Sequence, residues 1–321
     1  MQIGLFTPIF NTLTLNQLFI ELKKYPEVTA VEIGCGGWPG NSHIDVPRLL
    51  SDSIAAKEYR QRFADANLTI SALSCHNNPV HPDPQIATRD RAIIDDTIRL
   101  AERLEVPVVI TFSGCPGGAP GGTTPNWITA AWPPEYKSML DWQWEQQLIP
   151  YWRAVECTAS NAGVKIALEA HPGFCVYNPE TLLHLRDATG KSLGINLDPS
   201  HMWWQGIDIP TAIQDLGDAI FHFHAKDVFL NANQIRKNGV VDTKNYSRMT
   251  ERSWLFRSVG WGHSEIEWKA IASALRLVNY DYVMSIEHED ALASTSEGLR
   301  SAVSMLSRIL LREPPVDPFW T

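Results

Sequence analysis

The sequence lacks the features that mark a secreted or membrane-bound chain. Its N-terminus, MQIGLFTPIF, has no basic segment followed by an apolar stretch and a small-residue cleavage site. No later segment approaches the roughly 18 uninterrupted apolar residues of a membrane span. The five cysteines are widely spaced and include no CxxC pair, which argues against a zinc ribbon and a disulfide framework. We therefore expect a cytoplasmic protein with no membrane partner.

An excess of positive charge is also missing. The net charge of −9 opposes the basic surface that binding to phosphate backbones needs, so we expect no nucleic acid partner. The glycine-rich segment 114–122 lacks the GK[ST] ending of a phosphate loop and the GxGxxG order of a dinucleotide site. Twelve tryptophans indicate either helix packing with a subunit contact or a carbohydrate platform, so a homo-oligomer stays open.

Eight short runs of apolar and β-branched residues alternate with helical patterns. They predict strands at 3–6, 29–34, 68–76, 106–113, 164–171, 192–198, 220–226 and 282–288. Apolar residues at three- and four-residue spacings predict helices at 14–24, 90–104, 141–161 and 296–311. Eight strand–helix units predict an α/β fold of the (β/α)₈ TIM-barrel type, with an open doubly wound sheet as the alternative.

The organisation favours a single domain over residues 1–321. No linker rich in glycine, serine or proline divides the chain, and barrels of this length commonly form one unit. Two segments, at about 114–134 and 227–262, are too long for simple connections. Because loops after barrel strands lie at the C-terminal face, these two are expected to wall a pocket.

Ionisable residues stand at the ends of four successive predicted strands: Glu169, Asp198, His224 and Glu287. Three carboxylates that converge at one rim repel each other unless a cation neutralises them. Oxygen ligands with a single imidazole suit one divalent metal ion, with Mn²⁺ as first choice and Mg²⁺, Co²⁺, Zn²⁺ and Fe²⁺ also compatible.

Further polar residues are candidates for contact with a substrate. His171 and Lys226 each lie two residues beyond a proposed ligand and so share its inward side; a hydrogen-bonded rim residue and a salt bridge are the alternatives. His76 ends strand three and is expected to contact substrate. Glu32 either supports a polar pocket residue or contacts substrate itself. His222 lies one layer deeper and is expected to be a hydrogen-bonded core residue.

Several motifs together resemble a known family over nearly the whole chain. They are VEIG with Glu32, SCHNNPVHP with His76, LEAHP, LDPSH, HFHAKD, GWGHSEIEW and SIEHED. These segments are similar to the xylose isomerase-like TIM barrels, the sugar phosphate isomerases and epimerases that share the fold of the family 2 AP endonucleases. The resemblance implies that the chain acts on a small-molecule sugar or glycoside.

The resemblance also implies roles for particular residues. It makes Glu169, Asp198, His224 and Glu287 the metal ligands, and it gives the two glutamates acid–base work on opposite faces of a bound sugar. His201, three residues past Asp198, matches the histidine that contacts substrate in the family.

The chain departs from the ketose 3-epimerases at two positions. The arginine expected six residues beyond the metal histidine is Leu230, and the glutamate expected six residues past the first ligand is Cys175. Arg252 and Arg257, in the insertion after strand seven, are candidates to replace that arginine. The insertion is more similar to a subgroup associated with oxidised sugars and glycosides.

The reaction expected from these residues is a metal-dependent isomerisation or epimerisation. A base removes a proton next to a carbonyl, and the metal stabilises the enediolate that results. Elimination from a 3-keto-glycoside would use the same first step and is the main alternative. Phosphodiester hydrolysis of the AP-endonuclease type and noncatalytic sugar binding are further alternatives, and the acidic net charge disfavours the hydrolysis.

Overall fold

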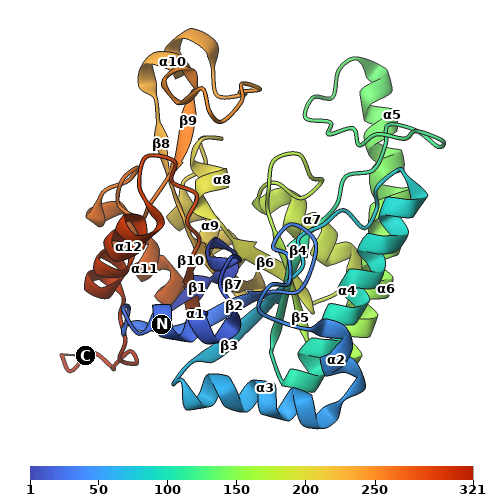
Figure 1. Ribbon diagram of the computed structural model, residues 1–321. Helices are drawn as coiled ribbons and strands as arrows, with labels where there is room; N and C mark the ends of the chain where they lie inside the picture. The colour runs from blue at the N-terminus through green and yellow to red at the C-terminus, as the bar shows by residue number, and fades with distance from the viewer. Residues whose placement is uncertain (321) are drawn as a thin grey trace.

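The computed structural model describes residues 1–320, and eight strands of this part form a closed parallel barrel (Figure 1). They are β1 (Gln2–Phe6), β2 (Val28–Gly34), β3 (Thr69–Ser74), β4 (Val108–Phe112), β5 (Lys165–Glu169), β6 (Leu193–Leu197), β7 (Ile220–Ala225) and β10 (Val283–Ile286). The barrel order is β1-β10-β7-β6-β5-β4-β3-β2, closed by the β1–β2 pair. The predicted TIM barrel is thus confirmed, and the open doubly wound sheet is excluded.

Helices surround the barrel (Figure 1). They are α1 (Leu15–Leu22), α2 (Val46–Ser51), α3 (Ser53–Asp65), α4 (Pro84–Leu104), α5 (Pro134–Trp142), α6 (Ile149–Asn161), α7 (Pro179–Thr189), α8 (Pro199–Trp203), α9 (Ile209–Leu216), α11 (Glu265–Leu277) and α12 (Thr295–Ile309), with 3-10 turns at Thr7–Phe10 and Gly217–Ala219. The residues just before several of these helices determine where each helix begins. In α11, for example, Ser264 and Glu267 form a reciprocal capping box that satisfies two free N–H groups.

The helix predicted at 141–161 begins earlier and is interrupted. It starts with α5 at Pro134, passes through a π-helical stretch at Gln143–Leu148 and continues as α6. Pro150 explains the interruption, because proline has no N–H to donate and its ring clashes with the carbonyl four residues before it. A π-helical turn accommodates both effects.

The segment 227–262, expected to be a long loop, contains regular structure. Strand β8 (Asp227–Leu230) pairs in antiparallel register with β9 (Trp254–Arg257), and α10 (Ala232–Asn238) and a 3-10 turn (Met249–Glu251) lie between them. Trp204 stacks on Trp254 with ring centroids 5.1 Å apart, which anchors the hairpin to α8. Figure 1 shows this hairpin as a projection from the barrel. The segment from Gly114 to Pro133, by contrast, has no helix or strand.

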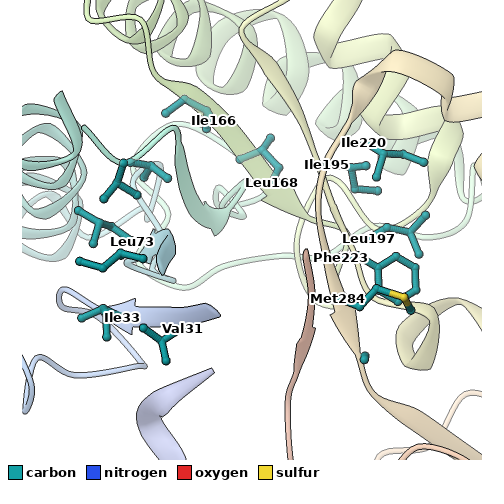
Figure 2. Packing of buried hydrophobic residues seen from close by; sticks show 14 of the residues in the cluster. Val31, Ile33, Leu73, Ile166, Leu168, Ile195, Leu197, Ile220, Phe223 and Met284 are labelled. Carbon is teal, nitrogen blue, oxygen red and sulfur yellow. The ribbon is translucent and has the colours of Figure 1, made fainter. Parts of the chain in front are cut away.

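Side chains alternate in direction along the barrel strands, as the two-residue period of a strand requires. In β7, Phe223 joins the main hydrophobic core together with residues of the surrounding helices, whereas His222 and His224 bond to polar groups of other strands. Figure 2 shows the apolar residues of this core. The polar side chains that face the inside of the barrel therefore position the candidate site.

Within residues 1–320, no helix combines the length and the apolar character that crossing a membrane requires.

Candidate metal centre and substrate cavity

Four side chains meet at the C-terminal end of the barrel. Glu169 is the last residue of β5, Asp198 directly follows β6, His224 lies near the end of β7, and Glu287 directly follows β10. These strands are consecutive around the barrel, which explains why residues far apart in sequence converge. One ligand atom from each residue lies within 4.8 Å of the others. The structure therefore brings together the four residues that the sequence singled out.

A buried carboxylate orients the histidine of this group. Nε2 of His224 lies 2.8 Å from Oε2 of Glu32, which also accepts a hydrogen bond from Ser285 at 3.1 Å. Burial alone would raise the pKa of Glu32, but its contacts with His224, His222 and Ser74 hold that pKa below its usual value. Glu32 is thus an anion that keeps the Nε2 proton in place and turns Nδ1 towards the other three residues.

Two atoms of the group are buried without a hydrogen-bond partner within residues 1–320. They are Nδ1 of His224 and Oδ2 of Asp198. Nδ1 lies 2.9 Å from Oε2 of Glu287 and 3.2 Å from Oε2 of Glu169, but in neither case with hydrogen-bond geometry. Buried polar atoms are normally paired, and Oδ2 of Asp198 does have an ion-pair partner in Nζ of Lys226 at 2.9 Å, so Nδ1 of His224 is the atom left to be explained. Three carboxylates and one imidazole that converge in this way fit a divalent cation.

Neighbouring groups keep the two glutamates ionised. Burial would raise the pKa of Glu169, but contacts with His201, His224 and His76 hold it well below its usual value. The nearest distances are 3.0 Å from His76 to Oε2 and 3.2 Å from His201 to Oε1. Burial also disfavours the charged form of Glu287, and there Lys226 and His224 overcome it and lower the pKa. Both residues are therefore available as proton acceptors.

Lys226 lies among the same carboxylates. Its Nζ is 2.8 Å from Oε2 of Glu287, 2.9 Å from Oδ2 of Asp198 and 3.0 Å from Oε2 of Glu289. Burial would lower the pKa of this lysine, but the surrounding carboxylates raise it well above its usual value. Lys226 is therefore a fixed positive charge that contacts two of the four candidate ligands.

Three further histidines surround the centre in different ways. The ring of His171 lies 4.0 Å from that of His201, and burial together with His201 lowers the pKa of His171 to about 3. His171 is therefore a neutral hydrogen-bonding group near neutral pH. His222 lies deeper, with Nδ1 3.1 Å from Oδ1 of Asn196, and burial lowers its pKa to about 4. It is the buried, hydrogen-bonded core histidine that the sequence indicated.

A cavity of about 690 Å³ opens over the centre. Glu169, Glu287, Lys226, His76 and His171 are part of its polar lining, and the last three are residues for which the sequence suggested contact with a substrate. The rest of the lining is mostly apolar and comes from the start of the chain, the loop after β2, the end of β4, the loop after β5, the β8–β9 insertion and the loop after β10. The volume lies within the range of small-molecule sites.

A family model described as the xylose isomerase-like TIM barrel matches residues 22–309. The chain belongs to this family. It is 39% identical over 286 residues to the uncharacterized protein YfiH of Bacillus subtilis (strain 168), a match covering 88% of this chain and 91% of that protein. The family assignment confirms the resemblance seen in the sequence.

Two solved structures illustrate the fold of the family. A D-psicose 3-epimerase crystallised in the presence of D-fructose has a TM-score of 0.62 and 13% identity, with coverage of 98% of this chain and 100% of the other. The IolI protein with a bound zinc atom has a TM-score of 0.65 and 17% identity, with coverage of 97% and 98%. At these identities the likeness shows the fold alone.

Three residues expected at the substrate are not among those lining the cavity within residues 1–320. Glu32 is fully buried against His224, and His201 is covered, with its Nε2 3.2 Å from Asp198 and from Glu169. Arg257 points its Nε at Asp290, at 3.0 Å, because this buried carboxylate neutralises its charge. The first two contact candidate ligands, whereas Arg257 links β9 to the loop after β10.

The departures from the epimerases have structural explanations. Leu230 packs with Trp204 and Trp254 at the base of the hairpin. Arg252 is buried, and its guanidinium lies 4.7 Å from the ring centroid of Trp254. Cys175 lines a separate cavity of about 610 Å³ beside α5 and α7. The cavity over the candidate metal centre therefore has no arginine among its described lining residues.

Sequence reasoning missed several residues of the cavity. Glu289 lies two residues beyond Glu287, and in an extended chain residues two apart point to the same side. This spacing could have assigned Glu289 to the site. Trp38, Tyr246 and Phe256 come from the loop after β2 and from the insertion after β7. Nothing in their local sequence indicates that these segments meet, because the contact depends on how the hairpin folds back over the barrel.

Proposed function

We propose that this chain is a divalent-metal-dependent enzyme that isomerises or epimerises a sugar by removing a proton next to a carbonyl. The observation that carries the proposal is the convergence of Glu169, Asp198, His224 and Glu287, whose ligand atoms lie within 4.8 Å of one another and include the unpaired Nδ1 of His224. The family match and the names of the fold relatives, a sugar 3-epimerase and a zinc-bound protein, support it.

In this proposal, a bound cation would act as a Lewis acid on adjacent sugar oxygens and stabilise the enediolate. Oxygen-rich ligands favour Mn²⁺, and Mg²⁺, Co²⁺, Zn²⁺ and Fe²⁺ are the competitors. Glu169 or Glu287 removes the carbon-bound proton, since both are ionised and both line the cavity. The carboxyl group so formed returns the proton to the neighbouring carbon, whereas return on the opposite face needs the other glutamate to take a proton from water first. His76 and His171 hold sugar hydroxyl groups, and the fixed charge of Lys226 orients the substrate oxygens nearest Glu287.

Elimination from a 3-keto-glycoside is the second candidate function. It begins with the same proton removal but ends with departure of the glycosidic oxygen instead of return of the proton. The absence of an arginine from the described cavity lining and the apolar character of the mouth favour a substrate larger than a free ketose. The two functions therefore differ in the product and share the residues that act first.

The test is carbon-bound proton exchange in D₂O. Metal-loaded protein is incubated with a panel of free ketoses and 3-keto-glycosides, and deuterium uptake next to the carbonyl and the product are followed by NMR. Glu169→Gln and Glu287→Gln should each slow turnover at least about 100-fold, the size typical of general acid–base catalysis. Glu27→Gln, at an exposed position, is the matched control.

Metal occupancy is measured in parallel by elemental analysis, because each glutamine variant also removes a candidate ligand. Turnover of a confirmed substrate with neither exchange nor a primary isotope effect at that carbon would refute proton abstraction. Undiminished turnover in metal-free protein would refute the metal requirement. A free sugar product assigns epimerisation or isomerisation, and a released aglycone assigns elimination.

A further inference from the structure

The cavity over the candidate metal centre has two zones of different chemistry. Its polar side chains, including Glu169, Glu287, His76 and His171, stand at or just beyond the ends of the barrel strands. Its outer part is formed by large apolar side chains from loops and from the β8–β9 hairpin. A sugar ring can place its hydroxyl groups in the polar zone, and the aromatic side chains of the outer zone then suit a second group that is flat and apolar.

The rim of the cavity exposes three large apolar residues to solvent. Trp38 is 83% exposed, and Tyr246 and Leu292 are each 55% exposed. They come from the loop after β2, the hairpin insertion and the loop after β10, yet all three line the same cavity. Apolar side chains that gather around one opening from separate segments mark a binding surface, since single exposed residues would be scattered.

Aromatic walls connect the rim to the polar zone. The ring of Phe256 lies 4.8 Å from Nζ of Lys226 and is stacked on Tyr246, with centroids 5.9 Å apart and planes at 18°. Phe112 and Phe174 form another stacked pair, with centroids 4.2 Å apart and planes at 19°. Flat walls of this kind suit a flat hydrophobic group, because offset stacking on aromatic faces adds to the burial of apolar area.

The charges in the cavity disfavour an anionic substrate. Lys226 is the one lysine or arginine among the described lining residues, and three carboxylates already surround it at 2.8–3.0 Å. Glu169 adds a further carboxylate to the same lining. A phosphate or carboxylate on the sugar would meet no unpaired side-chain cation here, and the charge of a bound divalent ion would already be offset by Glu169, Asp198 and Glu287.

We propose that the substrate is an uncharged glycoside whose sugar carries a ketone and whose aglycone is aromatic; the methyl and phenyl glucosides used below are unreactive binding probes for it. Its sugar would lie in the polar zone, and its aglycone would lie between Phe256, Tyr246 and Trp38 at the rim. This inference rests on the proposed function for the sugar part and adds the class of group that the sugar carries. A free or phosphorylated hexose would leave the aromatic walls uncovered.

The experiment measures binding to the metal-loaded protein by isothermal titration calorimetry. Three probes are compared: methyl β-D-glucoside, phenyl β-D-glucoside and glucose 6-phosphate. The variants are Trp38→Ala and Tyr246→Ala. Trp320→Ala is the matched control, because this tryptophan is also exposed, at 74%, and is not part of the cavity lining.

Phenyl β-D-glucoside should bind at least about tenfold more tightly than the methyl glucoside, and glucose 6-phosphate no more tightly than the methyl glucoside. Each cavity variant should weaken binding of the phenyl probe by about 2- to 12-fold, the range expected for one aromatic pair, and leave the methyl probe unchanged. Trp320→Ala should change neither affinity. A phenyl glucoside that binds no better than the methyl glucoside, including the case in which neither binds, overturns the proposal.

Two further outcomes also overturn it. One is tighter binding of glucose 6-phosphate than of the methyl glucoside. The other is a rim that serves a second copy of the chain: sedimentation would then show that Trp38→Ala converts a dimer into a monomer, with the affinity for the phenyl probe unchanged. The D₂O exchange assay is independent of these measurements. A preference for the phenyl probe without proton exchange in any sugar of the panel would therefore refute the proposed reaction and leave the aglycone site standing. Proton exchange without a preference for the phenyl probe would refute the aglycone site and leave the proposed reaction standing.

Discussion

Replacement of Glu32 by glutamine tests whether this buried carboxylate prepares His224 for a cation. Glu32 is fully buried, and its Oε2 accepts hydrogen bonds from Ser285 and, at 2.8 Å, from Nε2 of His224. Glutamine has nearly the same volume but no charge. It can also present its NH₂ group to the imidazole, which would favour the tautomer with the proton on Nδ1, the atom that faces the candidate ligands.

The expected loss follows from the role of such partners. A carboxylate that orients a metal-ligating histidine typically contributes 10- to 100-fold to metal affinity, which is about 1.4–2.8 kcal/mol. Glu32 is the nearest partner of Nε2 of His224, and its other side-chain hydrogen bonds, within residues 1–320, are to Ser74 and Ser285 and not to the other three candidate ligands. We therefore expect Mn²⁺ to bind Glu32→Gln about 10- to 100-fold more weakly, with the ligand set otherwise intact.

The assay is calorimetric titration of metal-free protein with Mn²⁺, after circular dichroism has established that each variant is folded. Glu32→Asp keeps the charge but withdraws the carboxylate, and it should give an intermediate loss. Glu27→Gln, on the surface, should bind Mn²⁺ like the wild type. If folded Glu32→Gln keeps its Mn²⁺ affinity within about threefold, the role assigned to Glu32 is wrong.

Three other predictions concern separate parts of the site. His224→Ala should lose metal binding, whereas His201→Ala should keep the metal and lose turnover; elemental analysis and kinetics on both decide this, and full metal content in His224→Ala would contradict it. Asp227 is fully buried and accepts backbone N–H groups of Gly260, Gly262 and His263, so Asp227→Asn should destabilise the fold by about 1–3 kcal/mol in thermal unfolding, and an unchanged melting temperature would contradict this. Burial raises the pKa of Asp290, but hydrogen bonds from backbone N–H groups and the charge of an arginine overcome this effect and hold the pKa below its usual value. Asp290 therefore stabilises the fold at pH values above the usual aspartate pKa. The difference in stability between the wild type and Asp290→Asn should shrink as the pH falls through the pKa of Asp290 in the folded state. A difference that stays constant down to about pH 2 would rule this out.

The barrel could be predicted from the sequence because each strand carries its own signal. In β7, the run IFHFHAK alternates apolar residues with histidines, and this period of two is set by the strand itself. Eight such runs were enough to predict the barrel. Because parallel strands end at the same rim, the meeting of Glu169 with Glu287 could be expected from the strand order without knowledge of any side-chain contact.

The hairpin over the cavity could not be predicted in the same way. Strands β8 and β9 have four residues each and are separated by a polar segment, so neither has a period long enough to recognise. Their pairing depends on contacts such as the Trp204–Trp254 stack, which exist only after the chain has folded back. For the same reason Arg257 was expected at the substrate, since the sequence gives no sign that Asp290 would neutralise it.

Lys226 alters the argument that first pointed to a metal. The sequence argument held that converging carboxylates need a cation, and the structure shows that the chain itself supplies one between Asp198 and Glu287. Burial would raise the pKa of Glu287, and the charge of Lys226 is the largest of the effects that lower it. Because protonated oxygens bind a divalent ion poorly, the lysine keeps Glu287 ready to act as a ligand. Lys226 also contacts Glu289, 3.0 Å away at the edge of the cavity, so its charge has one carboxylate partner that is not a candidate ligand.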